Sequence, residues 1–134
     1  MKKELQEKLY NDFPQLFQDK GKSAEETPMF WGCSIGNGWY DLMHKACEKL
    51  MQLGLPEDFR FVQIKEKFGG LRAYTSGVSK DMYQAVTDII HEAEDEADET
   101  CEYCGSKENV TQAGSWIKTL CSECRDNNVK TWEE

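Results

Sequence analysis

The chain has 134 residues, of which 25 are Asp or Glu and 16 are Lys or Arg, so its formal net charge is −9. This length accommodates one domain with a single core and excludes a large multidomain enzyme. The acidic total argues against sequence-independent binding to duplex nucleic acid, which depends on Lys and Arg that neutralise phosphates. No run approaches the roughly 18 uncharged apolar residues of a membrane-spanning helix, and the start lacks the apolar stretch of a signal peptide. We therefore expect a soluble, cytoplasmic protein that binds neither membranes nor duplex nucleic acid.

The excess negative charge is concentrated in one segment. Residues 81–100 contain eight acidic residues and no Lys or Arg, whereas residues 51–80 contain five basic and three acidic residues. The chain therefore combines a strongly acidic segment with a short, locally basic one.

The first hydrophobic pattern predicts a helix near the N-terminus. Leu5, Leu9 and Phe13 recur every four residues, and Pro14 must end or kink that helix. Residues 18–28 are polar and contain turn formers, which predicts an exposed loop of low stability. Residues 30–40 then combine four large aromatic residues with three glycines, a mixture that is unusual for a linker.

Three further elements make up the predicted core. Apolar residues within 39–53 follow one face of a helix, which Gly54 and Pro56 end. Residues 59–75 contain two β-forming runs joined by a glycine-containing turn, which predicts an antiparallel hairpin. Apolar residues within 82–97 mark another amphipathic helix, whose opposite face is nearly all carboxylate. Together they predict an α+β fold in which amphipathic helices pack on a small antiparallel sheet.

The C-terminal region contains two CxxC pairs separated by 16 residues. This spacing matches a four-thiolate zinc site, and a closed site of this kind has no free position for water or substrate. We therefore expect the zinc to stabilise the fold rather than to catalyse a reaction. An iron–sulfur cluster uses the same ligands and remains an alternative, whereas a cytoplasmic location disfavours disulfides. The predicted ligands are Cys101, Cys104, Cys121 and Cys124.

The predicted organisation is one compact domain in two parts. Residues 1–100 form the α+β core, and residues 101–134 form a zinc knuckle and a tail that pack on this core. Trp116, Ile117 and Leu120 are expected to provide the small hydrophobic contact between the knuckle and the core.

Aromatic and basic residues around the predicted hairpin indicate a candidate ligand site. Aromatic rings stack on bases and basic side chains contact phosphates in small nucleotide and single-strand sites, although rings of this kind also fill cores. The predicted ligand-binding residues are Trp31, Trp39, Lys65, Lys67, Arg72 and Tyr74. Tyr40 and Phe68 are two further aromatic residues that could stack on a base.

The acidic helix has two interpretations. Most carboxylate-rich faces are simply solvated, but a dense row of carboxylates can imitate a phosphate backbone and bind in a basic groove of a partner protein. The residues predicted to make such a contact are Glu92, Asp95, Glu96 and Glu99.

Catalytic patterns are weak in this sequence. His44 and His91 have no Ser, Cys or carboxylate partner that spacing alone would identify. The segment Gly36-Asn37-Gly38 precedes a helix and could present backbone N–H groups to an anion, but helix capping is the simpler interpretation. A nuclease or nucleotide-processing enzyme that uses the two histidines is therefore the alternative to a binding protein. A purely structural accessory protein is the third hypothesis.

Five segments form a specific combination along most of the chain: residues 13–17, 38–42, 61–72, 101–105 and 116–121. The most specific part is Gln63 to Arg72 together with the downstream cysteine pairs. This combination resembles a group of small uncharacterised proteins encoded by bacteriophages and prophages. The resemblance implies a phage protein made in a bacterial cytoplasm and favours a binding role, but it transfers no functional residue.

We therefore expect a non-enzymatic, zinc-stabilised binding protein that acts between a phage and its host, for example as a counter-defence inhibitor. Two mechanisms are open: the acidic helix could bind a host protein, or the basic hairpin and the aromatic residues could hold a small nucleotide. The oligomeric state is not predicted.

Overall fold

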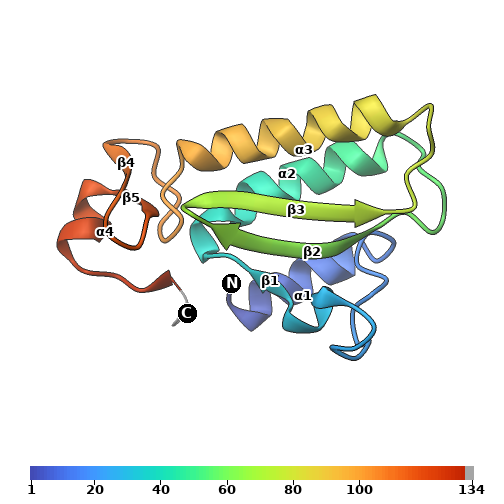
Figure 1. The fold of residues 1–134 in the computed structure, drawn as a ribbon, viewed down its shortest axis with the longest axis horizontal. Coiled ribbons are helices and arrows are strands. Elements are labelled where there is room, and N and C mark those ends of the chain that lie inside the picture. The colour runs from blue at the N-terminus through green and yellow to red at the C-terminus, as the bar shows by residue number, and fades with distance from the viewer. Residues whose placement is uncertain (132–134) are drawn as a thin grey trace.

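The structure is a computed structural model that describes residues 1–131, and it contains helices, a three-stranded sheet and a separate two-stranded hairpin (Figure 1). In chain order the elements are α1 (Lys3–Asp12), the short 3-10 helix η1 (Pro28–Trp31), β1 (Cys33–Ser34), a second 3-10 helix η2 (Asn37–Trp39), α2 (Tyr40–Met51), β2 (Arg60–Lys67), β3 (Gly70–Ser76), α3 (Tyr83–Asp98), β4 (Val110–Ala113), β5 (Lys118–Cys121) and α4 (Ser122–Asp126). The predicted α+β class is confirmed.

The antiparallel hairpin predicted over residues 59–75 is present as β2 and β3. Lys65 lies opposite Arg72 and Lys67 lies opposite Gly70 in this pair. The short strand β1 runs parallel to β2 along its other edge, with Cys33 opposite Ile64. The sequence did not predict β1, because two residues are too few to show an alternating pattern.

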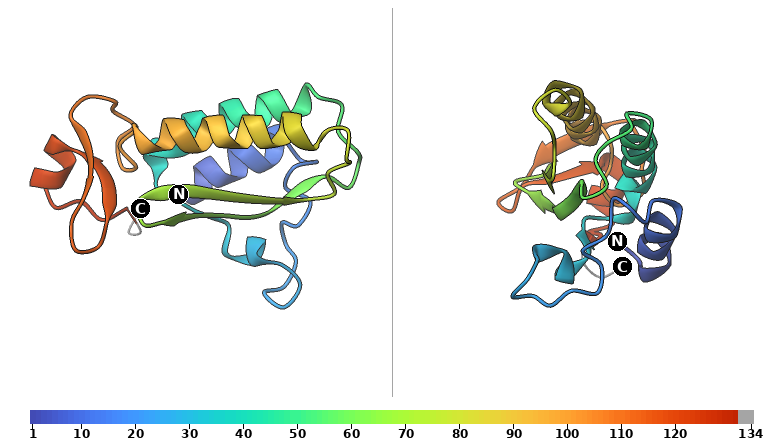
Figure 2. Two further views of the ribbon diagram at one scale, coloured as in Figure 1. Left: turned by 45° about the horizontal axis from the view of Figure 1, so that its top comes forward. Right: turned by 90° about the vertical axis from the view of Figure 1, so that its right-hand side faces the viewer.

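The long helices α1, α2 and α3 lie on one side of the three-stranded sheet (Figure 2). Side chains alternate along a strand, so one set of residues in β2 and β3 faces these helices and the other set faces away. Ile64 and Leu71 belong to the buried set, whereas Arg72 and Tyr74 are exposed. The sheet therefore has one core face and one outer face.

The main core fills the space between the helices and the sheet. Its largest fully buried side chains include Phe59, Phe61 and Trp39. The ring of Trp39 has no exposed surface, and its Nε1–H donates a hydrogen bond to the carbonyl oxygen of Thr100 at 2.9 Å. Trp39, predicted as a ligand-binding residue, is therefore a core residue instead, because a ligand cannot stack on a ring that is completely enclosed.

The loop at residues 18–28, predicted to have low stability, is anchored near both ends. Asp19 and Thr27 are buried, and the hydroxyl of Thr27 donates to Oδ2 of Asp19 at 2.8 Å. Nε–H of Arg60 in β2 donates to Oδ1 of Asp19 at 2.8 Å. This buried carboxylate explains why the polar loop is held against the sheet, and it also neutralises one of the basic residues of the hairpin.

Within the described residues, no helix has the length and apolar character needed to cross a membrane.

Candidate metal centre and the surfaces around it

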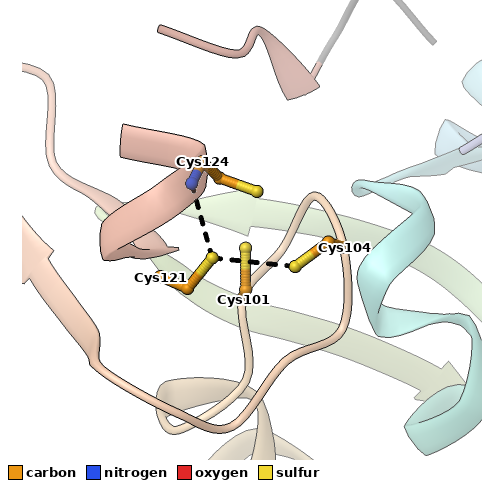
Figure 3. Close-up of side chains that lie close together, drawn as sticks. All are labelled: Cys101, Cys104, Cys121 and Cys124. Atoms are coloured by element: carbon orange, nitrogen blue, oxygen red, sulfur yellow. Dashed lines mark hydrogen bonds between the residues drawn. The ribbon is translucent and has the colours of Figure 1, made fainter. Parts of the chain in front are cut away.

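Four cysteine side chains converge at the C-terminal end of the molecule (Figure 3). Cys101 and Cys104 lie in the turn after α3, Cys121 ends β5, and Cys124 lies in α4. Their sulfur atoms all lie within 4.8 Å of one another, and those of Cys104 and Cys121 are 3.7 Å apart. Four thiolates arranged tetrahedrally about 2.3 Å from a central ion would be about 3.8 Å apart. The arrangement could therefore hold one metal ion.

Backbone hydrogen bonds shape both CxxC turns. In the first turn, the N–H of Gly105 donates to the carbonyl oxygen of Cys101 at 2.9 Å, and Gly105 has a φ of +83° that favours glycine. In the second turn, the N–H of Cys124 donates to Sγ of Cys121 at 3.5 Å. Cys121 is also the N-cap of α4. Each turn thereby directs two sulfur atoms towards the same point.

The same contacts affect the ionisation of the thiols. The backbone N–H of Cys124 lowers the pKa of Cys121, which favours the thiolate form that binds metal ions. Burial raises the pKa of both Cys104 and Cys124. Because these two thiols resist ionisation on their own, metal binding at this site must be coupled to the release of their protons.

The knuckle has very little hydrophobic core of its own. Among the described residues, its buried cluster consists of Cys101, Leu120, Cys121 and Cys124, with Val110 and Val129 packed against it. Three of the four buried residues are candidate metal ligands. So little apolar burial cannot by itself offset the conformational entropy lost on ordering this region, so a metal ion is the expected source of its stability.

The prediction that Trp116, Ile117 and Leu120 form the hydrophobic contact between the knuckle and the core is wrong. Leu120 is buried, but it belongs to the cluster of the knuckle itself. Trp116 is 76% exposed and Ile117 is 40% exposed, so neither residue caps the main core. The contact between the two parts is made by polar groups instead.

Glu102 is a deeply buried member of these polar groups, with 1% of its surface exposed. Its Oε2 accepts a hydrogen bond from the N–H of Gly36 at 3.0 Å, and its carbonyl oxygen accepts one from the N–H of Gly38 at 2.8 Å. A Cβ atom on Gly38 would lie 2.2 Å from the carbonyl oxygen of Cys101, so the close approach requires glycine there. The Gly36-Asn37-Gly38 segment, a candidate anion site in the sequence, thus binds a carboxylate of its own chain.

Lys118 in β5 provides a second polar link. Its Nζ lies 2.8 Å from Oε1 of Glu66 at the end of β2 and 3.7 Å from Oε1 of Glu102. The hydroxyl of Thr119 donates to the carbonyl oxygen of Gly69 at 2.6 Å. Sequence reasoning missed these residues, because no spacing rule distinguishes Glu102 or Lys118 from the other charged residues around them.

Four of the predicted ligand-binding residues lie on the outer face of the sheet. Lys65 and Lys67 are two residues apart in β2 and therefore point to the same side, and Arg72 is the cross-strand neighbour of Lys65. Tyr74 is two residues further along β3 and is 45% exposed. Trp31 is 70% exposed but lines a cavity of about 310 Å³ beside β1 that none of these four residues borders.

The acidic helix α3 is partly neutralised by lysines of the same chain. Glu92 accepts a hydrogen bond from Lys49 of α2, and Glu96 accepts one from Lys45 of α2 and another from Lys107 at 2.9 Å. Burial acts to raise the pKa of Glu96, but the two lysines outweigh it and lower that pKa. Two of the four predicted partner-binding carboxylates are therefore engaged within the chain.

The other two carboxylates of this predicted set are exposed: Asp95 lies on α3, and Glu99 is the C-cap residue directly after it. The exposed acidic surface that could meet a basic partner is accordingly smaller than the sequence indicates.

The two histidines lie in different surroundings. The ring nitrogens of His44 lie 3.0 Å from Oε1 of Glu48 and 3.2 Å from Oδ2 of Asp12, and its ring packs edge-on against Phe13. His91 is exposed on α3. Both nitrogens of His44 thus have carboxylate partners of the chain itself.

Comparisons with known proteins found no family model, no curated protein and no solved structure that matches this chain, so the candidate residues rest on its own sequence and geometry.

Proposed function

We propose that this chain is a metal-stabilised, non-enzymatic protein that binds a small nucleotide on the outer face of the sheet. The observation that supports this proposal is the arrangement of Lys65, Lys67 and Arg72 beside Tyr74 on the outer face of the sheet, the face turned away from α1, α2 and α3. A nucleotide presents a negatively charged phosphate and a flat base, and these are the two chemical features that Lys or Arg and an exposed aromatic ring recognise.

Zinc is the metal that we infer for the four cysteines. Zinc binds four thiolates in a tetrahedron with edges of about 3.8 Å, and the separation of 3.7 Å between Cys104 and Cys121 supports this geometry. An iron–sulfur cluster places several iron and sulfide ions between its cysteines, so it requires more space than sulfur atoms within 4.8 Å of one another leave. Elemental analysis of the purified protein should find about one zinc per chain, and iron in its place would refute this assignment.

The contacts of α3 favour a nucleotide over a host protein as the ligand. A carboxylate row that imitates a phosphate backbone acts through its attraction to Lys and Arg of a partner. Glu92 and Glu96 already contact Lys49, Lys45 and Lys107 of this chain, which reduces the charge available for such a partner.

A phage origin remains a proposal that rests on the resemblance of the five sequence segments. In a bacterial cytoplasm, a phage protein that holds a signalling nucleotide would lower its free concentration and thereby act as a counter-defence inhibitor. The proposed chemistry of binding does not depend on this setting.

The proposal is tested by titrating the zinc-loaded protein with linear and cyclic mono- and dinucleotides in a calorimeter. Lys65→Ala and Arg72→Ala should each weaken the binding of the best nucleotide by about tenfold, since each removes a charged contact to phosphate. Lys80→Ala is the matched control, because it removes one exposed positive charge outside β2 and β3. Binding that is equally strong in Lys65→Ala, Arg72→Ala and Lys80→Ala, or no binding of any nucleotide, would refute the proposal.

A further inference from the structure

An apolar slot lies where the tips of the two hairpins meet. The β2–β3 hairpin contributes Glu66, Lys67 and Phe68, the β4–β5 tip contributes Ser115, Trp116 and Ile117, and the volume between them is about 380 Å³. This volume lies within the range of small-molecule pockets, about 300–1,000 Å³. Its three large apolar side chains are unusually exposed, with fractions of 69% for Phe68, 76% for Trp116 and 40% for Ile117.

Hydrogen bonds between the two tips fix the shape of this slot. The hydroxyl of Thr119 donates to the carbonyl oxygen of Gly69 at 2.6 Å, and Nε2 of Gln112 lies 3.0 Å from the same hydroxyl. The N–H of Gly69 donates to Oε2 of Glu66 at 2.7 Å, and Glu66 is in turn paired with Lys118. A slot whose walls are held by partly buried polar contacts is preorganised for a ligand.

The backbone of Phe68 indicates that its ring has a role other than stability. Phe68 has a φ of +54°, in the left-handed region that residues with a side chain seldom adopt, and Gly69 follows with a φ of +81°. Two-residue turns of this type usually carry Asn or Asp at the first position. The ring of Phe68 gains little from burial, so a strained phenylalanine at this tip is best explained by contact with a ligand.

We propose that this slot receives the base of the bound nucleotide, which stacks against Phe68 and Trp116 while Lys67 and Lys65 contact its phosphate. The inference rests on the proposed function and specifies that Phe68 and Trp116, rather than Tyr74, hold the base. Nζ of Lys67 lies 5.5 Å from the centre of the Phe68 ring, which places a positive charge at the edge of the slot. Lys65 follows on the same face, about 6.6 Å further along the strand.

The charges around the slot favour a mono- or dinucleotide over a long single strand. The basic residues of the outer face extend from Lys67 through Lys65 to Arg72. Arg72 shares a cavity with three carboxylates of α3: Glu94, Asp95 and Asp98. A longer strand would bring further phosphates close to these carboxylates, and the net charge of −9 would add to the repulsion. A short ligand carries fewer phosphates and avoids repulsion both from the carboxylates of α3 and from the net negative charge.

Two substitutions test the slot without disturbing the turn or the core. Phe68→Asn removes the ring and suits the positive φ, because Asn tolerates the left-handed conformation. Trp116→Gln removes a ring that is mostly exposed already. The matched control is Tyr83→Gln, which removes another exposed aromatic side chain, 58% accessible, at the start of α3.

We expect Phe68→Asn and Trp116→Gln each to weaken calorimetric binding of the best mono- or dinucleotide by about fivefold or more, the loss typical of one stacking contact. Tyr83→Gln should bind as the wild type does. Ribose 5-phosphate, which has no base, should bind weakly and equally to the wild type and to both slot variants. A cooperative thermal unfolding transition at or above the wild-type temperature would show that the variants are folded.

The outcomes separate this inference from the proposed function. Nucleotide binding that depends on Lys65 and Arg72 but is unchanged in Phe68→Asn and Trp116→Gln would overturn the slot and leave the proposed function standing. A short single-stranded oligonucleotide that binds more tightly than every mono- or dinucleotide would overturn the small ligand as the occupant. No binding of any nucleotide would overturn both proposals.

Discussion

The carboxylate of Glu102 accepts a hydrogen bond from the backbone N–H of Gly36 at 3.0 Å, although 66 positions separate the two residues in the chain. Glu102 lies inside the first CxxC turn, and Gly36 immediately precedes η2, which leads directly into α2. The candidate metal centre and the start of the central helix are therefore connected through one buried side chain. Any change that disturbs the first cysteine turn should therefore also destabilise the beginning of α2.

Glu102→Ala should lower the free energy of unfolding by about 3 kcal/mol, because the substitution leaves the N–H of Gly36 without its acceptor and removes one carboxylate beside Lys118. Urea denaturation followed by circular dichroism measures this change. Glu99→Ala, at an exposed position on the same segment, should change the stability by less than about 0.5 kcal/mol. Equal stability of the two variants would show that Glu102 does not connect the two parts.

Loss of a metal ligand should affect the knuckle more than the core. Cys121→Ser should abolish stoichiometric metal binding and remove the order of residues 101–131, since structural zinc supplies apparent free energies of about 10–16 kcal/mol in small modules. Among the described residues, the main hydrophobic core includes no residue beyond Ala97, so its helices and sheet should persist, with a lower stability because the contact of Glu102 with Gly36 is lost. Elemental analysis and nuclear magnetic resonance spectra report the two effects separately.

Cys47→Ala provides the control for this experiment. Cys47 is a buried thiol of the main core and lies outside the four-cysteine cluster. Its replacement should leave the metal content unchanged. If Cys121→Ser retained a full complement of metal, the four cysteines would not be the ligands.

Local patterns predicted α1, α2, α3, the β2–β3 hairpin and the cysteine cluster, but they did not predict β1, the β4–β5 hairpin or α4. The spacing of each CxxC pair is enough to predict two neighbouring metal ligands, because such a turn directs two sulfur atoms to one point. The helices and the β2–β3 hairpin follow from the period of their apolar residues. These features depend on neighbours a few positions apart, and so a single sequence contains the information.

Packing between distant segments determines which aromatic and acidic side chains are buried, and the sequence did not predict this. Trp39 and Trp116 are chemically identical, yet Trp39 is enclosed by the core, where it contacts Thr100, whereas Trp116 is 76% exposed at a hairpin tip. In the sequence, Glu102 is one of many acidic residues and nothing distinguishes it from the others. Its structural role becomes visible only from its hydrogen bond with Gly36. Contacts between residues more than 60 positions apart have no local signature.

The buried carboxylate of Asp19 predicts a specific dependence of stability on pH. Burial acts to raise the pKa of Asp19, but hydrogen bonds from Lys22, Thr27 and Arg60 outweigh it, so the folded-state pKa lies below that of the unfolded chain. The resulting stabilisation is fully present above the unfolded pKa of about 3.9 and is lost as the pH falls through the lower, folded value.

Asp19→Asn should therefore be less stable than the wild type at neutral pH, and the difference should shrink below about pH 4. Denaturation at a series of pH values measures this convergence. Glu25→Gln, in the exposed part of the same loop, should follow the wild-type curve throughout. A constant difference between Asp19→Asn and the wild type would show that ionisation of Asp19 does not contribute.

The turn at Phe68 predicts opposite effects on stability and on binding. Because Asn tolerates a φ of +54° better than Phe does, Phe68→Asn should leave the free energy of unfolding unchanged or raise it by about 0.5–1 kcal/mol. Gly69→Ala should lower it by about 1 kcal/mol or more, because its φ is +81° and the added Cβ would lie 3.1 Å from both Ile117 and Thr119. Denaturant titration of both variants measures these changes. A clear loss of stability in Phe68→Asn would mean that the ring supports the fold, whereas a gain accompanied by weaker nucleotide binding would mean that the chain retains strain at this tip for the sake of its ligand.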